Sequence, residues 1–213
     1  MVLIAPSLLA ANPACLGDEV KQLENAGADL LHFDVMDGHF VPNMTYGPFI
    51  LRKLKKITHM PFDVHLMVDN PEKIIPWFIE AGADIITFHL EATSQPDELL
   101  KTIQNAGIKA GVSLKPNSNM KIISQLNRTP DLVLVMGVEP GFGGQTFRPD
   151  TPQRIVQTKQ LCPSALIEVD GGINQKTAQL CIDAGAEILV AGTAVFENGS
   201  YKKNILSIKG DAQ

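Results

Sequence analysis

An imidazole, a carboxylate and a thioether recur at alternate positions of one short segment, as His32, Asp34 and Met36. Residues two apart in an extended strand point to the same face, so these side chains share one face while Phe33 and Val35 line the other. An Asp-Gly pair, which is a turn signal, follows directly. The segment therefore predicts a strand whose carboxyl end delivers polar groups to a site built from loops.

Two later apolar segments carry matching groups near their ends. Phe62–Val68 places His65 and Met67 two apart, and Leu166–Ile173 places Asp170 directly before two glycines. Imidazole and carboxylate groups coordinate Zn²⁺, Mn²⁺, Fe²⁺ or Co²⁺, and two carboxylates balance the charge of a dication. We therefore predict one divalent ion (Zn, Fe, Mn or Co) per subunit, held by His32, Asp34, His65 and Asp170.

A single histidine on a strand is more often a structural hydrogen-bonding group than a metal ligand. A purely structural role does not explain the two histidines and two aspartates together. Buried charges need partners, and no Lys or Arg lies on these strand ends. His89 ends another apolar segment and could enter the site, but we expect a structural role for it.

Eight apolar segments, several of them apolar almost throughout, predict strands of a parallel sheet that is covered on both faces. They are Leu3–Leu8, Leu30–Val35, Phe62–Met67, Ile85–Leu90, Lys109–Leu114, Leu132–Met136, Leu166–Val169 and Ile188–Ala191. Amphipathic segments between them predict helices, at Asp18–Ala26, Asn70–Ala81, Pro96–Ala106, Asn119–Leu126, Thr151–Leu161, Asn174–Ala184 and Tyr201–Ile208. Asn70 and Asn174 are expected to cap their helices.

A short phrase built around a glycine precedes four of the predicted strands, at Gly27, Gly82, Gly107 and Gly185. Glycine in the left-handed conformation commonly ends a helix, so each phrase closes a helix and leads into a strand. Repetition of one strand-then-helix unit predicts the α/β class and a single-domain (β/α)8 barrel over residues 1–213. A doubly wound open sheet is the rival, but its GxGxxG motif is absent after the first strand.

Asp34 and Asp170 fall on the second and seventh predicted strands, three apart around the shorter arc of such a barrel. They should therefore approach a bound substrate from different sides. Two carboxylates that flank one carbon can remove a proton from one face and return a proton to the other. That carbon must be acidified by a neighbouring carbonyl, and a metal on the carbonyl oxygen stabilises the enediolate. The pair predicts inversion at a carbon next to a ketone.

Glycine-rich loops follow the last three predicted strands, where barrel enzymes often bind phosphate. Backbone N–H groups of glycines can converge on an anion, although such glycines can also serve only as tight turns. The candidate phosphate-loop residues are Gly141, Phe142, Gly143, Gly144, Gly171, Gly172, Gly192 and Thr193. Three methionines at strand ends either fill gaps in the core or form a wall that excludes water, at Met36, Met67 and Met136.

The chain has 213 residues, 45% of them hydrophobic, and a net charge of −5 without any basic block. This balance argues against nucleic acid or an anionic membrane surface as a partner. Cys15, Cys162 and Cys181 are scattered and odd in number, which favours reduced thiols and a cytoplasmic location. The apolar start of the chain is too short to span a bilayer and is expected to be a buried strand.

The motifs resemble those of the ribulose-phosphate 3-epimerase family. HFDVMDGHFVPN, DVHLMV, FHLEA, VEPGFGGQ, EVDGGIN and AGTAVF occur in the family's order, and the likeness runs from Ala5 to Phe196. The resemblance implies interconversion of D-ribulose 5-phosphate and D-xylulose 5-phosphate in the pentose phosphate pathway. It also implies a homo-oligomer, a dimer or a hexamer.

The same resemblance assigns roles to residues. Those that match His32, Asp34, His65 and Asp170 would bind the metal, and Asp34 and Asp170 would be the acid/base pair. Ser7 and His65 match substrate-contacting positions, the three methionines match residues around the reacting carbon, and the glycine loops match the phosphate site.

Two rivals remain open from the residues alone. An epimerase of a hexulose 6-phosphate, such as allulose 6-phosphate, would use the same acid/base and metal groups with a different sugar pocket. A non-catalytic phosphosugar-binding barrel would need neither Asp34 nor Asp170, so the presence of both counts against it.

Overall fold

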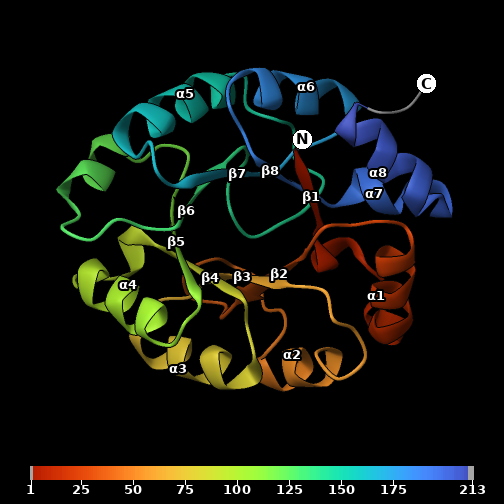
Figure 1. Ribbon diagram of the computed structural model, residues 1–213, viewed down its shortest axis with the longest axis horizontal. Helices are drawn as coiled ribbons and strands as arrows, with labels where there is room; N and C mark the ends of the chain where they lie inside the picture. The colour runs from red at the N-terminus through yellow and green to blue at the C-terminus, as the bar shows by residue number, and fades with distance from the viewer. Residues whose placement is uncertain (1, 211–213) are drawn as a thin grey trace.

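The computed structural model describes residues 2–210 and contains eight parallel strands surrounded by a ring of helices (Figure 1). The strands are hydrogen-bonded in the order β1-β8-β7-β6-β5-β4-β3-β2. Their bounds are β1 Leu3–Pro6, β2 Leu31–Met36, β3 Phe62–Met67, β4 Ile85–His89, β5 Lys109–Leu114, β6 Leu132–Met136, β7 Leu166–Asp170 and β8 Ile188–Ala191. A bridge between Ser7 and His32 joins the two edge strands, so the predicted (β/α)8 barrel is confirmed.

The helices alternate with the strands along the chain (Figure 1). They are α1 Leu16–Asn25, α2 Pro48–Leu54, α3 Pro71–Ala81, α4 Pro96–Asn105, α5 Thr151–Leu161, α6 Gln175–Asp183, α7 Thr193–Phe196 and α8 Tyr201–Lys209. The sequence did not predict α2, and the segment expected to be a helix at Asn119–Leu126 forms the 3₁₀ helix Met120–Gln125 instead. None of the helices within residues 2–210 is both long and apolar enough to cross a membrane.

Most of the residues predicted to begin or end helices are found at helix ends in the structure. Asn174 caps α6 with a full capping box in which Thr177 bonds back to the Asn174 backbone, as expected. Asn70 occupies the N-cap position of α3, as expected, but its side chain makes no capping hydrogen bond. Each of the four phrase glycines has a positive φ, from 76° at Gly107 to 104° at Gly185. Left-handed backbone at these positions turns the chain from helix to strand.

Three of the four phrases, those that end in an acidic residue, also tie the end of a helix to the strand before it. In each, the acidic residue two positions after the glycine accepts a hydrogen bond from one backbone N–H at the start of the preceding strand. The same carboxylate forms an ion pair with a lysine. The three arrangements are Asp29 with Ile4 N and Lys209 Nζ (2.8 and 2.8 Å), Asp84 with Phe62 N and Lys55 Nζ (2.7 and 2.8 Å), and Glu187 with Ile167 N and Lys159 Nζ (3.1 and 2.8 Å). These contacts hold the amino ends of the strands, opposite the edge where the predicted metal ligands lie.

Two hydrophobic layers stabilise the fold. The larger one lies between the strands and the helices, and the smaller one fills the inside of the barrel, with Leu132, Leu134 and Val190 among its members. Cys162 and Cys181 are buried as expected, whereas Cys15 is only half-buried, and all three thiols are free. The interior also holds buried polar side chains above and between the apolar ones, including Asp63, Thr87, Ser113 and Glu168.

Close packing of the interior explains a glycine inside strand β5. Gly111 lies in register with Thr87 of β4, and a Cβ added there would lie 2.2 Å from Thr87 Oγ1 and 3.1 Å from Leu132 Cδ2. We expect Gly111→Ala to lower the free energy of unfolding by about 1–3 kcal/mol, measured by urea denaturation, because an extra methyl strains a filled core. Gly143→Ala is the control, since a Cβ there meets nothing within 4 Å. Equal stability of the two variants would contradict the interior packing described here.

Candidate metal and active site

The four predicted ligands come together at the carboxyl ends of strands β2, β3 and β7. Each offers one atom, and the four atoms lie within 4.8 Å of one another. The register explains this, because Asp34 pairs with His65 across β2 and β3. Asp34 Oδ1 lies 3.3 Å from His32 Nε2 and 3.1 Å from His65 Nδ1, and Asp170 Oδ2 lies 4.0 Å from the latter.

His32 is oriented from beneath by two further acids. Its Nδ1 donates to Asp63 Oδ2 at 2.6 Å, and Glu168 Oε1 lies 3.7 Å from the same nitrogen. All three side chains are fully buried. Burial and the neighbouring charge of Asp63 raise the pKa of Glu168 well above its usual range, which favours the neutral form of this side chain. The sequence analysis did not single out Asp63 or Glu168, although each is two positions from a predicted ligand and therefore shares its face.

His65 is oriented from its other side. Its Nε2 lies 2.9 Å from Nε2 of His89, so His89 reaches a predicted ligand although sequence left its role open. Burial, the largest effect, lowers the pKa of His89 to about 4, and the imidazole is neutral. The two ligand histidines thus present different nitrogens to the cluster, Nε2 from His32 and Nδ1 from His65.

The two aspartates differ in their affinity for protons. Burial opposes ionisation of Asp34, but the charge and hydrogen bond of His32 outweigh burial and hold the pKa well below its usual range. Ser7 Oγ also donates to Asp34 Oδ2 at 2.8 Å. Burial and the negative charge of Asp34 raise the pKa of Asp170 to about 6. Such a split is typical of a pair in which one group is a base and the other can carry a proton.

The cluster fits a divalent cation on its own chemistry. His32 Nε2 is buried and lacks a hydrogen-bond partner among the described residues, and it points at Asp34. Asp34 Oδ1 faces both ligand histidines, and its Oδ2 is occupied by Ser7. Two imidazole nitrogens and two carboxylate oxygens form a ligand set that Zn²⁺ and similar ions accept. These contacts support the predicted metal site without identifying the ion.

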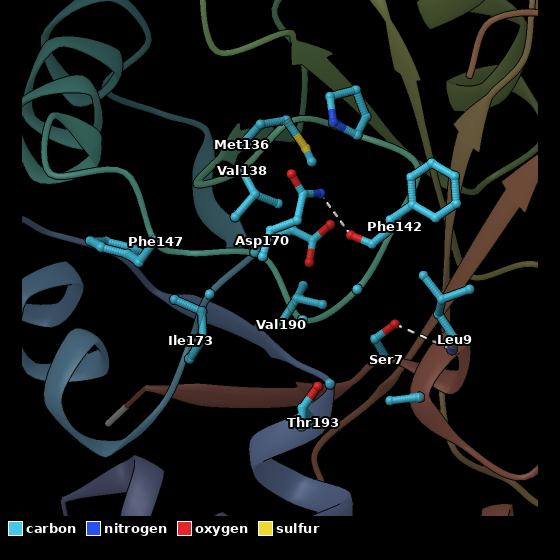
Figure 2. Close-up of a pocket in the computed structure, with 18 of the residues that line it drawn as sticks. Ser7, Leu9, Met136, Val138, Phe142, Phe147, Asp170, Ile173, Val190 and Thr193 are labelled. Atoms are coloured by element: carbon cyan, nitrogen blue, oxygen red, sulfur yellow. Dashed lines mark hydrogen bonds between the residues drawn. The ribbon is translucent and has the colours of Figure 1, made fainter. Parts of the chain in front are cut away.

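A cavity of about 850 Å³ opens above this cluster. It is lined by the carboxylates of Asp34 and Asp170, by Ser7, and by every predicted methionine and phosphate-loop residue, namely Met36, Met67, Met136, Gly141, Phe142, Gly143, Gly144, Gly171, Gly172, Gly192 and Thr193. His65, predicted also to contact substrate, is fully buried and does not line it. Figure 2 shows Asp170, Ser7 and Thr193 around the same space, with Phe142 on its far side.

The loops are held to one another by contacts that the sequence did not reveal. Asn43, from the loop after β2, donates to the Gly141 carbonyl at 2.8 Å. Gln145 Nε2 donates to the carbonyls of Glu139 and Phe142 at 2.7 and 2.8 Å, which fixes the loop after β6. Asn43 and Gln145 both belong to motifs quoted from the sequence, but their roles become clear only from their hydrogen-bond partners. The partner of Asn43 lies 98 residues away, and those of Gln145 lie 3 and 6 residues away.

Fold and site together define a (β/α)8 barrel with a candidate metal centre at the carboxyl ends of its strands. Comparison with known proteins makes the class more specific. A sequence model described as the Ribulose-phosphate 3 epimerase family matches residues 3–196. The ribulose-phosphate 3-epimerase of Bacillus subtilis is 46% identical over 99% of both chains. The chloroplastic enzyme of Arabidopsis thaliana is 44% identical over 98% of this chain and 76% of its own. The chain belongs to the ribulose-phosphate 3-epimerase family.

Solved structures support the fold independently. A mutant tryptophan synthase α-subunit from Pyrococcus furiosus superposes with a TM-score of 0.73 at 15% identity, covering 98% of both chains. Phosphoribosyl anthranilate isomerase from Thermus thermophilus gives a TM-score of 0.70 at 13% identity, covering 99% of this chain and 98% of its own. At these identities the likeness concerns the barrel alone.

Metal binding should release protons, and this gives a test of the ligand set. The charges of Asp34 and Asp63 outweigh burial and raise the pKa of His32 well above its usual range, so an ion must displace its proton. Below about pH 6 it must displace the Asp170 proton as well. We expect Zn²⁺ affinity, measured by chelator competition, to rise with pH. Below about pH 6, loss of the Asp170 proton should add about a further tenfold per pH unit to this rise.

The control for this pH dependence is Asp170→Asn, which has no carboxyl proton to lose at that position. Its affinity should be lower throughout, but the extra steepness below about pH 6 should disappear. Zn²⁺ affinity that is the same at pH 5 and pH 8 in the unaltered protein would contradict the assignment of His32 and Asp170 as ligands.

Proposed function

We propose that this protein interconverts D-ribulose 5-phosphate and D-xylulose 5-phosphate by inverting C3, the carbon next to the ketone. The observation that carries the proposal is the position of Asp34 and Asp170, which share one cluster and line one cavity although they come from opposite sides of the seam between β1 and β2. Named relatives with this activity cover nearly the whole chain.

The two carboxylates divide the proton transfers. An ionised aspartate takes the C3 proton from one face of the substrate, and the other, in its protonated form, gives a proton to the opposite face. The reverse reaction exchanges the two roles. The low pKa of Asp34 and the raised pKa of Asp170, at about 6, support this division, because Asp170 takes up a proton far more readily than Asp34 does. Positioned acid–base groups of this kind contribute about 10²–10⁴-fold each to the rate.

A divalent ion held by His32, Asp34, His65 and Asp170 would supply positive charge beside the ketone oxygen and stabilise the enediolate. The chain's own residues prepare for this charge. Asp63 holds the Nδ1 proton of His32, so the proton that an ion would displace is the one on Nε2, beside Asp34. We propose Zn, Fe, Mn or Co as the ion, because this donor set accepts each of them.

The remainder of the cavity suits the rest of the substrate. We propose that backbone N–H groups of the three glycine loops, with the Thr193 hydroxyl, bind the phosphate. Met36 and Met67 lie side by side across β2 and β3, are buried, and line the cavity with Met136. An aprotic wall at this place would keep water from a reactive enediolate. We also propose that the subunits form a homo-oligomer.

Removal of either carboxylate's basicity should stop the reaction. We expect Asp34→Asn and Asp170→Asn each to lower kcat by at least about 10²–10⁴-fold, measured by coupled assay of xylulose 5-phosphate formation. Circular dichroism should show an intact barrel in both. Asp18→Asn, an exposed position on α1, is the matched control and should retain activity. Near-normal turnover in either site variant would remove the mechanism that uses two carboxylates.

Isotope exchange separates this function from its rivals. In D₂O the protein should incorporate solvent deuterium at C3 of the substrate, whereas a phosphosugar-binding barrel without activity would incorporate none. Rates on ribulose 5-phosphate and on allulose 6-phosphate, compared as kcat/KM, distinguish the pentulose enzyme from a hexulose enzyme. Faster turnover of the hexulose phosphate would replace the proposed substrate.

Activity should also depend on the ion. We expect dialysis against a strong chelator to abolish epimerisation, because the two imidazoles and two carboxylates then have no cation between them. Addition of Mn²⁺, Fe²⁺, Co²⁺ or Zn²⁺ should restore it, with ion content measured by atomic emission. Full activity after metal content has fallen to background would show that the ligand set has another purpose.

A further inference from the structure

A chain of three side chains runs from the candidate metal site to the surface between β4 and β5. His65 Nε2 lies 2.9 Å from His89 Nε2, and His89 Nδ1 lies 3.6 Å from Glu91 Oε2. Both imidazoles are fully buried, while the Glu91 side chain is 24% exposed. His89 Nδ1 has no hydrogen-bond partner among the described residues, and the carboxylate of Glu91 faces it at 3.6 Å.

The short contact between the two histidines allows two proton arrangements. Only one of the facing nitrogens can carry the proton, since one must donate and the other accept. In the first arrangement His65 Nε2–H donates, which leaves a lone pair on His65 Nδ1 and places the His89 proton on Nδ1, facing Glu91. In the second, His89 Nε2–H donates, and His65 carries its proton on Nδ1, where a metal ion would have to bind.

The contact between His65 and Asp34 favours the second arrangement. Asp34 Oδ1 lies 3.1 Å from His65 Nδ1 and accepts a hydrogen bond if a proton is there. Glu91 acts in the opposite direction. Its negative charge faces His89 Nδ1, so a proton on that nitrogen is stabilised and a lone pair there is repelled.

We propose that Glu91, acting through His89, selects the tautomer of His65 that leaves Nδ1 free to bind the metal ion. The inference rests on the proposed metal site and makes both residues positioning residues for one ligand. No proton enters or leaves the chain in the selection, which only fixes on which nitrogens the existing protons reside.

Glu91 is itself held in place. Its Oε1 accepts from the backbone N–H of Lys115 at 2.8 Å and from the hydroxyl of Ser118, both in the loop after β5. Because Oε1 is occupied by two donors, Oε2 is the oxygen that faces His89. Phe40 packs on the His89 ring with centroids 4.8 Å apart and prevents the imidazole from turning away.

This arrangement makes Glu91→Gln a specific test. The two donors of the loop need an acceptor, so the glutamine oxygen takes the place of Oε1 and the amide N–H₂ faces His89 Nδ1. The amide then donates to His89, His89 donates to His65, and the proton of His65 moves to Nδ1. We expect the Zn²⁺ dissociation constant, measured by chelator competition, to rise about 10–100-fold, the range typical of groups that orient a metal ligand.

Ser118→Ala is the matched control, since it removes one loop contact of Glu91 and leaves the carboxylate facing His89. Its Zn²⁺ affinity should change by less than the lower end of that range. Equal affinities of Glu91→Gln and the unaltered protein would overturn the inference while leaving the metal site in place. Failure of the unaltered protein to bind Zn²⁺ would overturn both.

A second measurement does not depend on any variant. In Zn²⁺-loaded protein labelled with ¹⁵N-histidine, NMR should find His65 protonated on Nε2 and His89 protonated on Nδ1. A proton on His89 Nε2 in the loaded protein would overturn the inference.

Discussion

Negative charge inside the barrel is the constraint on which the rest of the structure depends. Asp34 and Asp170 lie at the upper layer, and Asp63 and Glu168 lie beneath them. Among residues 2–210, the ion-pair partners of these carboxyls are histidines, while the lysine and arginine pairs lie elsewhere. Buried charges without partners are costly. Burial therefore favours the protonated form of Glu168, and the upper pair has a ligand set that suits a dication.

Each of the two candidate ligand histidines is oriented by a hydrogen bond through one ring nitrogen, but the nitrogens differ. His32 is held through Nδ1 by Asp63, and His65 is held through Nε2 by His89. Each side chain therefore presents its remaining nitrogen to Asp34. Because the strands fix the backbone and these partners fix the rings, the site requires little rearrangement to bind an ion. Preorganisation of this kind is what permits a small set of side chains to stabilise charge that develops in a reaction.

The strands, and the clustering of the four candidate ligands, could be predicted from sequence because both follow from period-two alternation in apolar segments. The same rule would have reached Asp63 and Glu168, each two residues before a ligand, if the layer beneath the strand ends had been considered. The role of His89 could not be predicted, since it depends on a contact between neighbouring strands 24 residues apart. Helix α2 was missed because Pro48–Leu54 is short and follows a long loop, so its apolar periodicity covers only seven residues.

The acids of the repeated glycine phrase have a consequence for how the chain reaches its native state. Each one closes a ring of only 20–25 residues, made of one strand, one connection and one helix. Contacts so near in sequence cost little loop-closure entropy and favour rapid folding. A strand–helix pair can thus be fastened before the barrel closes, and assembly can proceed by addition of finished pairs. The junction with the greatest separation in sequence is the one between β1 and β8, so the barrel closes when its first and last strands pair.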